Sequence, residues 1–102
     1  MVDFDYINEN GKVTIVLRGY LTIAEVPELK EIFNKSIAES ENITIKHENN
    51  EGFDLAYIQL VLAAYRTAKE WRKNFKVICR ENDPFKRIFN EIGFKVEELF
   101  LN

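Results

Sequence analysis

Two segments with alternating apolar and polar residues open the chain. In Val2–Ile7 every second residue is apolar, and the same alternation returns in Lys12–Leu21, as expected for two half-buried strands. Asn10-Gly11 lies between them, and this dipeptide suits a type I′ turn, whose two central residues both have positive φ. The pattern therefore predicts an antiparallel hairpin.

Three later segments have the spacing of amphipathic helices. Thr22–Glu25 is a capping-box pattern, but Pro27 belongs in a first helical turn, so we expect a preliminary turn and then a regular helix from Pro27 to about Ser40. Asp54–Trp71 is apolar around most of its circumference, which predicts burial against more than one neighbour, with Asp54 as N-cap. A short third helix follows, with Asp83 as N-cap, Pro84 in its first turn and Gly93 at its end.

The segments between these helices complete the predicted fold. Ile43–Ile45, Phe75–Arg80 and Phe94–Leu101 are predicted strands, and the polar stretch His47–Gly52 is predicted to be a loop. Strands that alternate with helices pair in parallel through right-handed crossovers. We therefore expect an α/β fold with a mixed sheet of four to five strands, an N-terminal hairpin and three helices, and we expect function at the carboxyl ends of the parallel strands.

Composition narrows the class of protein. The 102 residues suit one domain, 1–102, and the formal net charge of −3 argues against nucleic-acid binding. One Cys and one His exclude a disulfide framework and a Cys/His zinc site. No apolar run is long enough to span a bilayer and the start is acidic, so we expect a cytoplasmic location without membrane insertion.

The order of several short motifs resembles the STAS domain family, which includes the anti-sigma-factor antagonists. Ile43–Ile45 followed by Phe53–Ala64 resembles the family's central strand, loop and apolar helix. Gly19–Thr22 with Pro27–Leu29 resembles its second strand and first helix, and Ile92–Phe94 resembles its late glycine step. The resemblance covers about residues 11 to 100 and implies a STAS-like fold.

The departures from the family pattern concern its phosphorylation site. Many antagonists have a serine, phosphorylated by a partner kinase, at the position of Ala56, and Ala56 has no hydroxyl. Leu55 replaces the preceding serine, Tyr57 the following glycine, and Lys46 an acidic residue at the end of the third strand. Because a phosphoserine would add a charge of about −1.5 to −2, its loss predicts steady protein contact without this switch.

Several candidate residues have two interpretations. Asp54 is a plain N-cap or a site residue, and Tyr57 is either core packing or an exposed contact. His47 is more simply a loop residue than a catalytic base, and Cys79 is more simply a buried thiol than a nucleophile. The carboxylates of Glu48, Glu51 and Asp54 are more simply a solvated acidic loop than a cation site. The basic side chains Arg66, Lys69, Arg72, Lys73 and Lys76 are more simply a soluble helix face than a nucleic-acid site.

No cofactor motif, metal cluster or nucleophile–base constellation is evident, so we expect a non-enzymatic regulatory module that binds another protein. The resemblance implies an anti-sigma-type kinase, a phosphatase or receptor-associated regulator, or a chemotaxis-type component as partner. An alternative is a structural accessory subunit of a lipid-transport ATPase complex, with the transporter ATPase as partner. A small-ligand or nucleotide-binding domain is a third hypothesis, disfavoured by the absence of a phosphate loop. The predicted partner-binding residues are Thr22, Ile23, Asn49, Asn50, Glu51, Asp54, Leu55, Ala56 and Tyr57.

Overall fold

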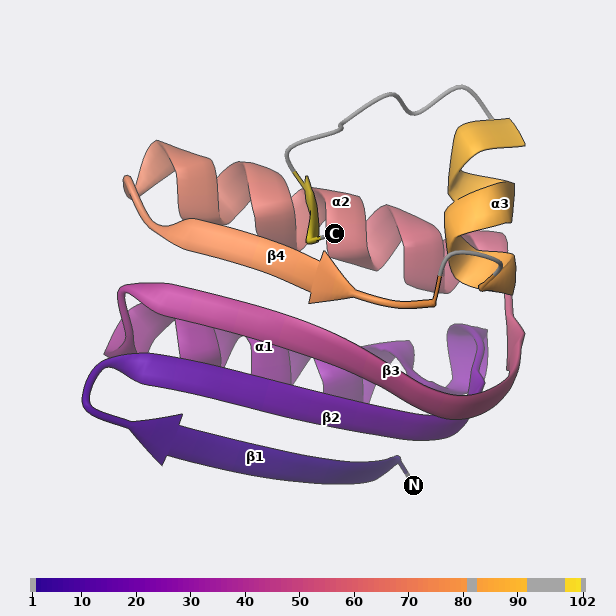
Figure 1. Cartoon of the computed structure of the whole chain (residues 1–102), viewed down its shortest axis with the longest axis horizontal. Coiled ribbons are helices and arrows are strands. Elements are labelled where there is room, and N and C mark those ends of the chain that lie inside the picture. Colours follow the sequence, from indigo (N-terminus) through magenta and orange to yellow (C-terminus); the bar gives the residue numbers. More distant parts are fainter. Residues whose placement is uncertain (1, 81–82, 92–98, 102) are drawn as a thin grey trace.

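The computed structural model describes residues 2–80, 83–91 and 99–101. Within these residues, five strands and three α-helices follow one another, and the 3₁₀ turn η1 precedes α1 (Figure 1). Their bounds are β1 Asp3–Glu9, β2 Lys12–Leu21, the 3₁₀ turn η1 Ile23–Glu25, α1 Val26–Glu39, β3 Asn42–Phe53, α2 Leu55–Glu70, β4 Asn74–Ile78, α3 Pro84–Glu91 and β5 Phe100–Leu101.

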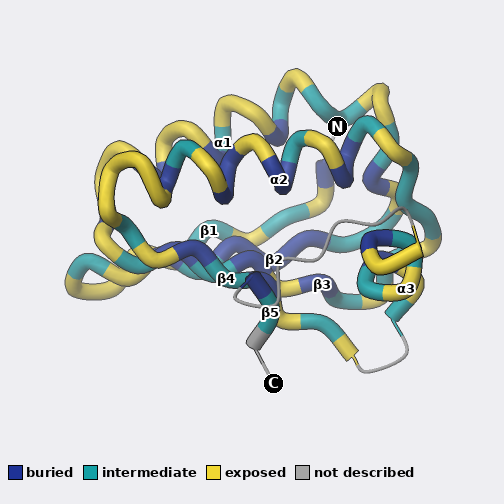
Figure 2. The backbone as a smooth tube through the Cα atoms, turned by 90° about the horizontal axis from the view of Figure 1, so that it is seen from above, coloured by how far each residue is buried: buried dark blue, intermediate teal, exposed yellow. Residues whose placement is uncertain are grey.

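The strands form one mixed sheet in the order β1-β2-β3-β4-β5. β1 pairs with β2 in antiparallel orientation, and the pairs β2–β3, β3–β4 and β4–β5 are parallel. Helices α1 and α2 lie side by side over one face of the sheet, and α3 lies at one end of the molecule (Figures 1 and 2). The predicted α/β fold, with its opening hairpin and parallel crossovers, is confirmed.

The hairpin forms as the sequence predicts. Asn10 and Gly11 have φ values of 52° and 80°, and Glu9 pairs with Lys12 across the turn. Both positive φ values agree with a type I′ turn, which matches the right-handed twist of the two strands.

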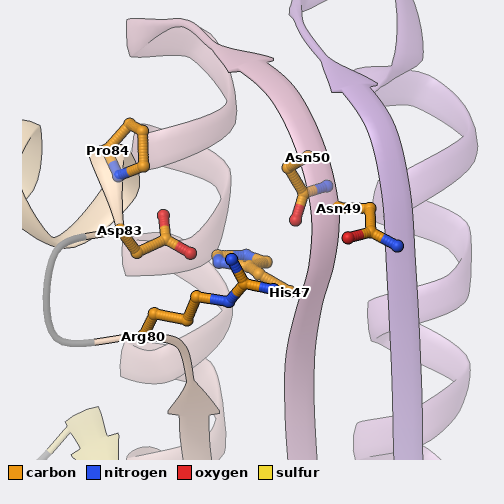
Figure 3. A pocket seen from close by; sticks show the side chains of 6 residues that line it. All are labelled: His47, Asn49, Asn50, Arg80, Asp83 and Pro84. Atoms are coloured by element: carbon orange, nitrogen blue, oxygen red, sulfur yellow. The ribbon is translucent and has the colours of Figure 1, made fainter.

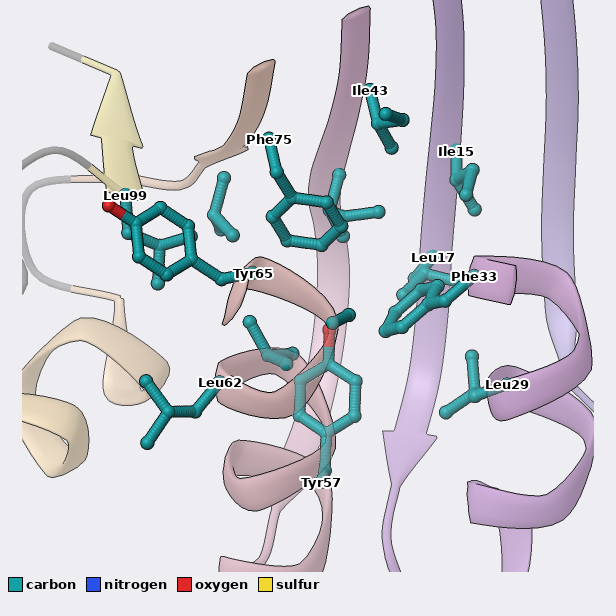
Figure 4. Close-up of a cluster of buried hydrophobic side chains, with 14 of the residues drawn as sticks. Ile15, Leu17, Leu29, Phe33, Ile43, Tyr57, Leu62, Tyr65, Phe75 and Leu99 are labelled. Carbon is teal, nitrogen blue, oxygen red and sulfur yellow. The ribbon is translucent and has the colours of Figure 1, made fainter. Parts of the chain in front are cut away.

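The core lies between the sheet and its two covering helices (Figure 4). Alternate residues of the strands point into it, so Ile15, Leu17 and Ile45 are completely buried. Leu29 of α1 and Ile58 of α2 meet them from the helix side and are equally buried. Burying a large aliphatic side chain contributes about 1.5–3 kcal/mol, so this layer is the main source of stability.

The region His47–Gly52 is not a loop, and the prediction there was wrong. It continues β3 to Phe53, paired with β2 as far as Leu21. The register shifts between Leu17 and Gly19 and again between Gly19 and Tyr20. No residue from His47 to Gly52 is aliphatic or aromatic apart from the histidine, so the sequence has no apolar alternation there to indicate a strand.

The first helix begins as expected, after a preliminary turn, but its capping box is incomplete. The Thr22 hydroxyl donates to the Glu25 carboxylate at 3.2 Å and makes no bond to a backbone N–H. Regular helix starts at Val26, with Pro27 in the first turn, and Ser40 follows its last residue.

The C-terminal part has the predicted order of elements, with differences at single residues. β4 ends at Ile78, two residues earlier than predicted, and Cys79 is half-buried instead of buried. β5, Phe100–Leu101, confirms the end of the last predicted strand, but Leu99, predicted in the same strand, has 3₁₀ conformation. The predicted strand residues 94–98 and the expected helix-ending Gly93 lie outside the described residues.

Candidate functional site

The carboxyl ends of β2 and β3 meet the first turn of α2 at one end of the molecule (Figure 1). Asp54 joins these elements. Its Oδ1 accepts a hydrogen bond from the Tyr57 backbone N–H at 3.2 Å, and its Oδ2 accepts from the Ile23 backbone N–H at 2.8 Å. Asp54 is thus the predicted N-cap of α2, and its second oxygen also holds η1 against that helix.

Three large apolar side chains are exposed around this junction. Ile23 is 69% exposed, Tyr20 59% and Leu55 52%. The Tyr20 ring lies against Gly52, where an added Cβ would stand 3.3 Å from the ring. We call Tyr20, Thr22, Ile23, Leu55 and Ala56 the strand-end surface. Tyr20 is not among the predicted partner-binding residues, although its outward position in an alternating strand indicates exposure.

The predicted partner-binding residues do not all lie on this surface. Tyr57 is completely buried, so it packs in the core and is not an exposed contact. Asn50 is half-buried, and its side-chain N–H group donates to the backbone carbonyls of Leu17 at 3.2 Å and Gly19 at 3.3 Å. Asn49, with φ of 52°, and Glu51 are exposed in β3.

His47 is a buried strand residue, and its assignment to a loop was wrong. Its Nε2 lies 2.7 Å from the Tyr57 hydroxyl, and its ring centre lies 5.0 Å from that of Phe53 and 4.7 Å from that of Phe85. Burial lowers the pKa of His47 to about 3, so the imidazole is neutral at pH 7. Burial likewise raises the pKa of Tyr57 well above its ordinary value.

A pocket of about 230 Å³ opens beside this histidine (Figure 3). On its other side Asp83 caps α3, because its Oδ1 accepts from the Phe85 backbone N–H at 2.8 Å. Burial raises the pKa of Asp83, while the capping hydrogen bond and the charge of Arg80 act against that rise. The lining residues are His47, Asn49, Asn50, Arg80, Asp83 and Pro84.

The acidic residues near β3 do not form a metal site in the described part of the chain. Glu48 instead accepts from Arg18 Nε at 3.0 Å, and Lys46 Nζ lies 3.9 Å from the same carboxylate. Arg18 also bonds Asp5 at 2.7 Å, and these carboxylates raise its pKa. Glu48 is therefore part of a network of ion pairs on the sheet face opposite the helices.

Among the described residues, no helix is both long and apolar enough to cross a membrane.

Ala56 is the second residue of α2 and is half-buried. Its side chain is a methyl group, so this position has no hydroxyl that could be phosphorylated. Both carboxylate oxygens of Asp54, two residues earlier, accept backbone hydrogen bonds.

Compared by sequence, the chain matches no family model and no curated protein. Solved structures share its fold. The anti-sigma factor antagonist SpoIIAA in its unphosphorylated form is 18% identical, with a TM-score of 0.72 over 98% of this chain and 88% of that one. The phosphorylated form of SpoIIAA from Bacillus is 19% identical, with a TM-score of 0.70 over 97% and 89%. An anti-sigma factor antagonist from Mycobacterium paratuberculosis is 15% identical, with a TM-score of 0.78 over 91% and 79%. The chain therefore has the STAS fold of the anti-sigma-factor antagonists.

Proposed function

We propose that this chain is a non-enzymatic regulatory module that binds another protein through the strand-end surface. The observation that carries the proposal is the exposure of Ile23, Leu55 and Tyr20 around the junction that Asp54 joins. Exposed apolar side chains that gather at one place are typical of protein-binding sites. A tyrosine and two aliphatic residues on a rigid strand–helix junction also lose little conformational entropy on binding.

The fold supports the same class of function. The solved structures that share it include proteins named anti-sigma factor antagonists. A signalling partner follows by analogy from those names, in the form of an anti-sigma-type kinase or a phosphatase or receptor-associated regulator. Ala56 stands where a phosphorylated serine is expected in this family, so binding here is not switched by phosphate at that position.

Site-specific photocrosslinking in the native cell tests this proposal. A photoreactive amino acid replaces Leu55 in one variant and Trp71, at the opposite end of α2 and 57% exposed, in the control. We expect one signalling protein to crosslink from position 55 and not from position 71. Equal crosslinking from both positions, or none from position 55, would contradict the proposed surface. A transporter ATPase as the crosslinked protein would favour the accessory-subunit alternative.

Charge substitution with the identified partner then measures the surface directly. We expect Ile23→Glu combined with Leu55→Glu to weaken binding at least 30-fold, because central interface residues contribute about 2 kcal/mol or more. Leu55→Glu alone and Trp71→Glu are the matched pair, since each places one negative charge on a similarly exposed side chain of the same helix region, and only Leu55→Glu should weaken binding. Tyr57 is unsuitable for such a test because its side chain is buried.

A further inference from the structure

Two residues that line the pocket beside His47 each have a buried polar atom without a hydrogen-bond partner within the described part of the chain. The two atoms are His47 Nδ1 and Asn50 Oδ1. His47 is only 7% exposed, and both residues line the pocket. An unsatisfied buried polar group costs about 1–3 kcal/mol, so a pocket with two of them favours a molecule that pairs with both.

The orientation of the Asn50 amide follows from its neighbours. Its nitrogen donates to two backbone carbonyls, those of Leu17 and Gly19, and carbonyls accept only. The amide cannot be turned round without setting oxygen against oxygen. Asn50 Oδ1 is therefore an acceptor and requires a donor from the pocket.

The protonation of His47 follows from Tyr57. The Tyr57 hydroxyl is buried with His47 Nε2 at 2.7 Å, and its proton is satisfied when it donates to that nitrogen. In the neutral imidazole the proton then lies on Nδ1. His47 Nδ1–H is therefore a donor and requires an acceptor from the pocket.

Charges of both signs complete the lining. Arg80 and Asp83 come from the segment between β4 and α3, and Figure 3 shows both side chains extending toward the His47 ring. The guanidinium favours an anionic acceptor and the carboxylate favours a cationic donor. The pocket thus offers His47 and Arg80 to an anionic group, and Asn50 and Asp83 to a cationic group of the same ligand.

The size of the pocket limits that ligand. A volume of about 230 Å³ is the share of roughly eight liquid waters at ~30 Å³ each. It lies below the ~300 Å³ lower end of drug-sized sites. We propose that the pocket binds a small zwitterion of the free α-amino-acid type. Its carboxylate accepts from His47 Nδ1–H and Arg80, and its ammonium donates to Asn50 Oδ1 and Asp83. This site is separate from the strand-end surface and does not depend on the proposed function.

Nuclear magnetic resonance titration of the whole purified chain tests the proposal. The probes are the twenty common L-amino acids, added singly, with acetate and methylammonium as half-ligands that carry one charge each. We expect at least one amino acid to give saturable shifts at the Asn50 side-chain amide and the His47 Nδ1 resonance. We expect each half-ligand to bind at least tenfold more weakly.

Two charge-neutralising variants assign the contacts. Arg80→Gln and Asp83→Asn should each weaken binding of that amino acid at least tenfold. Asn is as good an N-cap as Asp, and Arg80 is exposed, so both variants should fold, as spectral dispersion verifies. Arg87→Gln, on the exposed side of α3 and outside the pocket lining, is the matched control and should leave binding unchanged.

Three results would overturn the proposal. The first is no saturable shift with any amino acid, which would leave the two atoms bridged by water. The second is acetate binding as tightly as the best amino acid, which would make this an anion site only. The third is unchanged affinity in both Arg80→Gln and Asp83→Asn.

Discussion

At the scale of single residues, the hydrogen bond between His47 and Tyr57 determines which groups are buried beside the pocket. The neighbouring residues in the sequence do not show whether His47 lies in a loop or whether Tyr57 is exposed. His47 lies in a polar stretch, yet the rings that bury it belong to Phe53, Tyr57 and Phe85, from three different parts of the chain. Their packing makes the imidazole neutral and removes Tyr57 from the surface.

The hydroxyl of Tyr57 is expected to contribute to stability through this pair. Tyr57→Phe keeps the packed ring but leaves His47 Nε2 without its donor, at a cost of about 1–3 kcal/mol in the free energy of unfolding. Urea denaturation measures the difference. Tyr20→Phe is the control and should change stability by less than about 0.5 kcal/mol, because Tyr20 is exposed. Equal stability of Tyr57→Phe and the unmodified chain would mean that the hydroxyl contributes nothing.

At the scale of elements, β3 shows how pairing overrides local pattern. Its second half has little apolar alternation, but β2 supplies the partner backbone as far as Leu21. Asn49 accepts a left-handed conformation where the register shifts, which Asn tolerates better than most residues. The strand then delivers Asp54 to the start of α2, where one carboxylate joins strand end, turn and helix.

Removal of that carboxylate should loosen the junction. Asp54→Ala loses the α2 cap and the bond to the Ile23 N–H, and we expect the free energy of unfolding to fall by about 1–2 kcal/mol. Asp54→Asn keeps one capping oxygen and should lose less. Hydrogen exchange should show faster exchange of the Ile23 and Tyr57 amides in Asp54→Ala. Unchanged exchange at both amides would show that Asp54 does not hold the junction.

At the scale of the whole molecule, the two faces of the sheet differ in kind. One face is covered by α1 and α2 and holds the core (Figure 2). The other bears ion pairs around Arg18, which are mostly exposed and contribute little individually. Among the described residues, burial lowers the pKa of His47 and raises that of Asp83, so these two groups act on acid stability in opposite senses.

The stability of the molecule should fall in mild acid because of His47. The folded state holds this pKa near 3 and the unfolded state near its ordinary 6.5, so only the unfolded chain binds the proton between these values. Stability is then lost as pH falls from about 6.5 toward 3, by up to about 1.4 kcal/mol per pH unit. Asp83, whose pKa is raised, takes up its proton first in the folded state and partly opposes the loss.

The difference between the unmodified chain and His47→Gln isolates the histidine. Urea unfolding at pH 7 and pH 5 should show a smaller loss of stability in His47→Gln, because Asp83 and Arg80 are common to both proteins. Parallel pH profiles of the two proteins would contradict the assignment of this pKa.

Much of the fold and part of the site could be predicted from local spacing. Asn10-Gly11 made the hairpin, Asp54 and Asp83 made helix caps, and apolar periodicity placed three helices in order. Thr22 and Ile23 follow the end of β2, and Leu55 and Ala56 begin α2, as expected from the sequence. Their part in partner binding stays a prediction. These features depend on residues within a few positions of one another, so the sequence carries them directly.

The tertiary structure alone decided which of the remaining candidates are buried and which are paired. It extended β3 beyond Ile45, turned Tyr57 inward and enclosed His47 with its Nδ1 unpaired. It also placed His47 at a pocket that Asn50, Arg80 and Asp83 line as well. Burial and hydrogen-bond satisfaction depend on contacts between segments 10 to more than 30 residues apart. Such contacts have no periodicity along the chain, and only the folded arrangement brings their partners together.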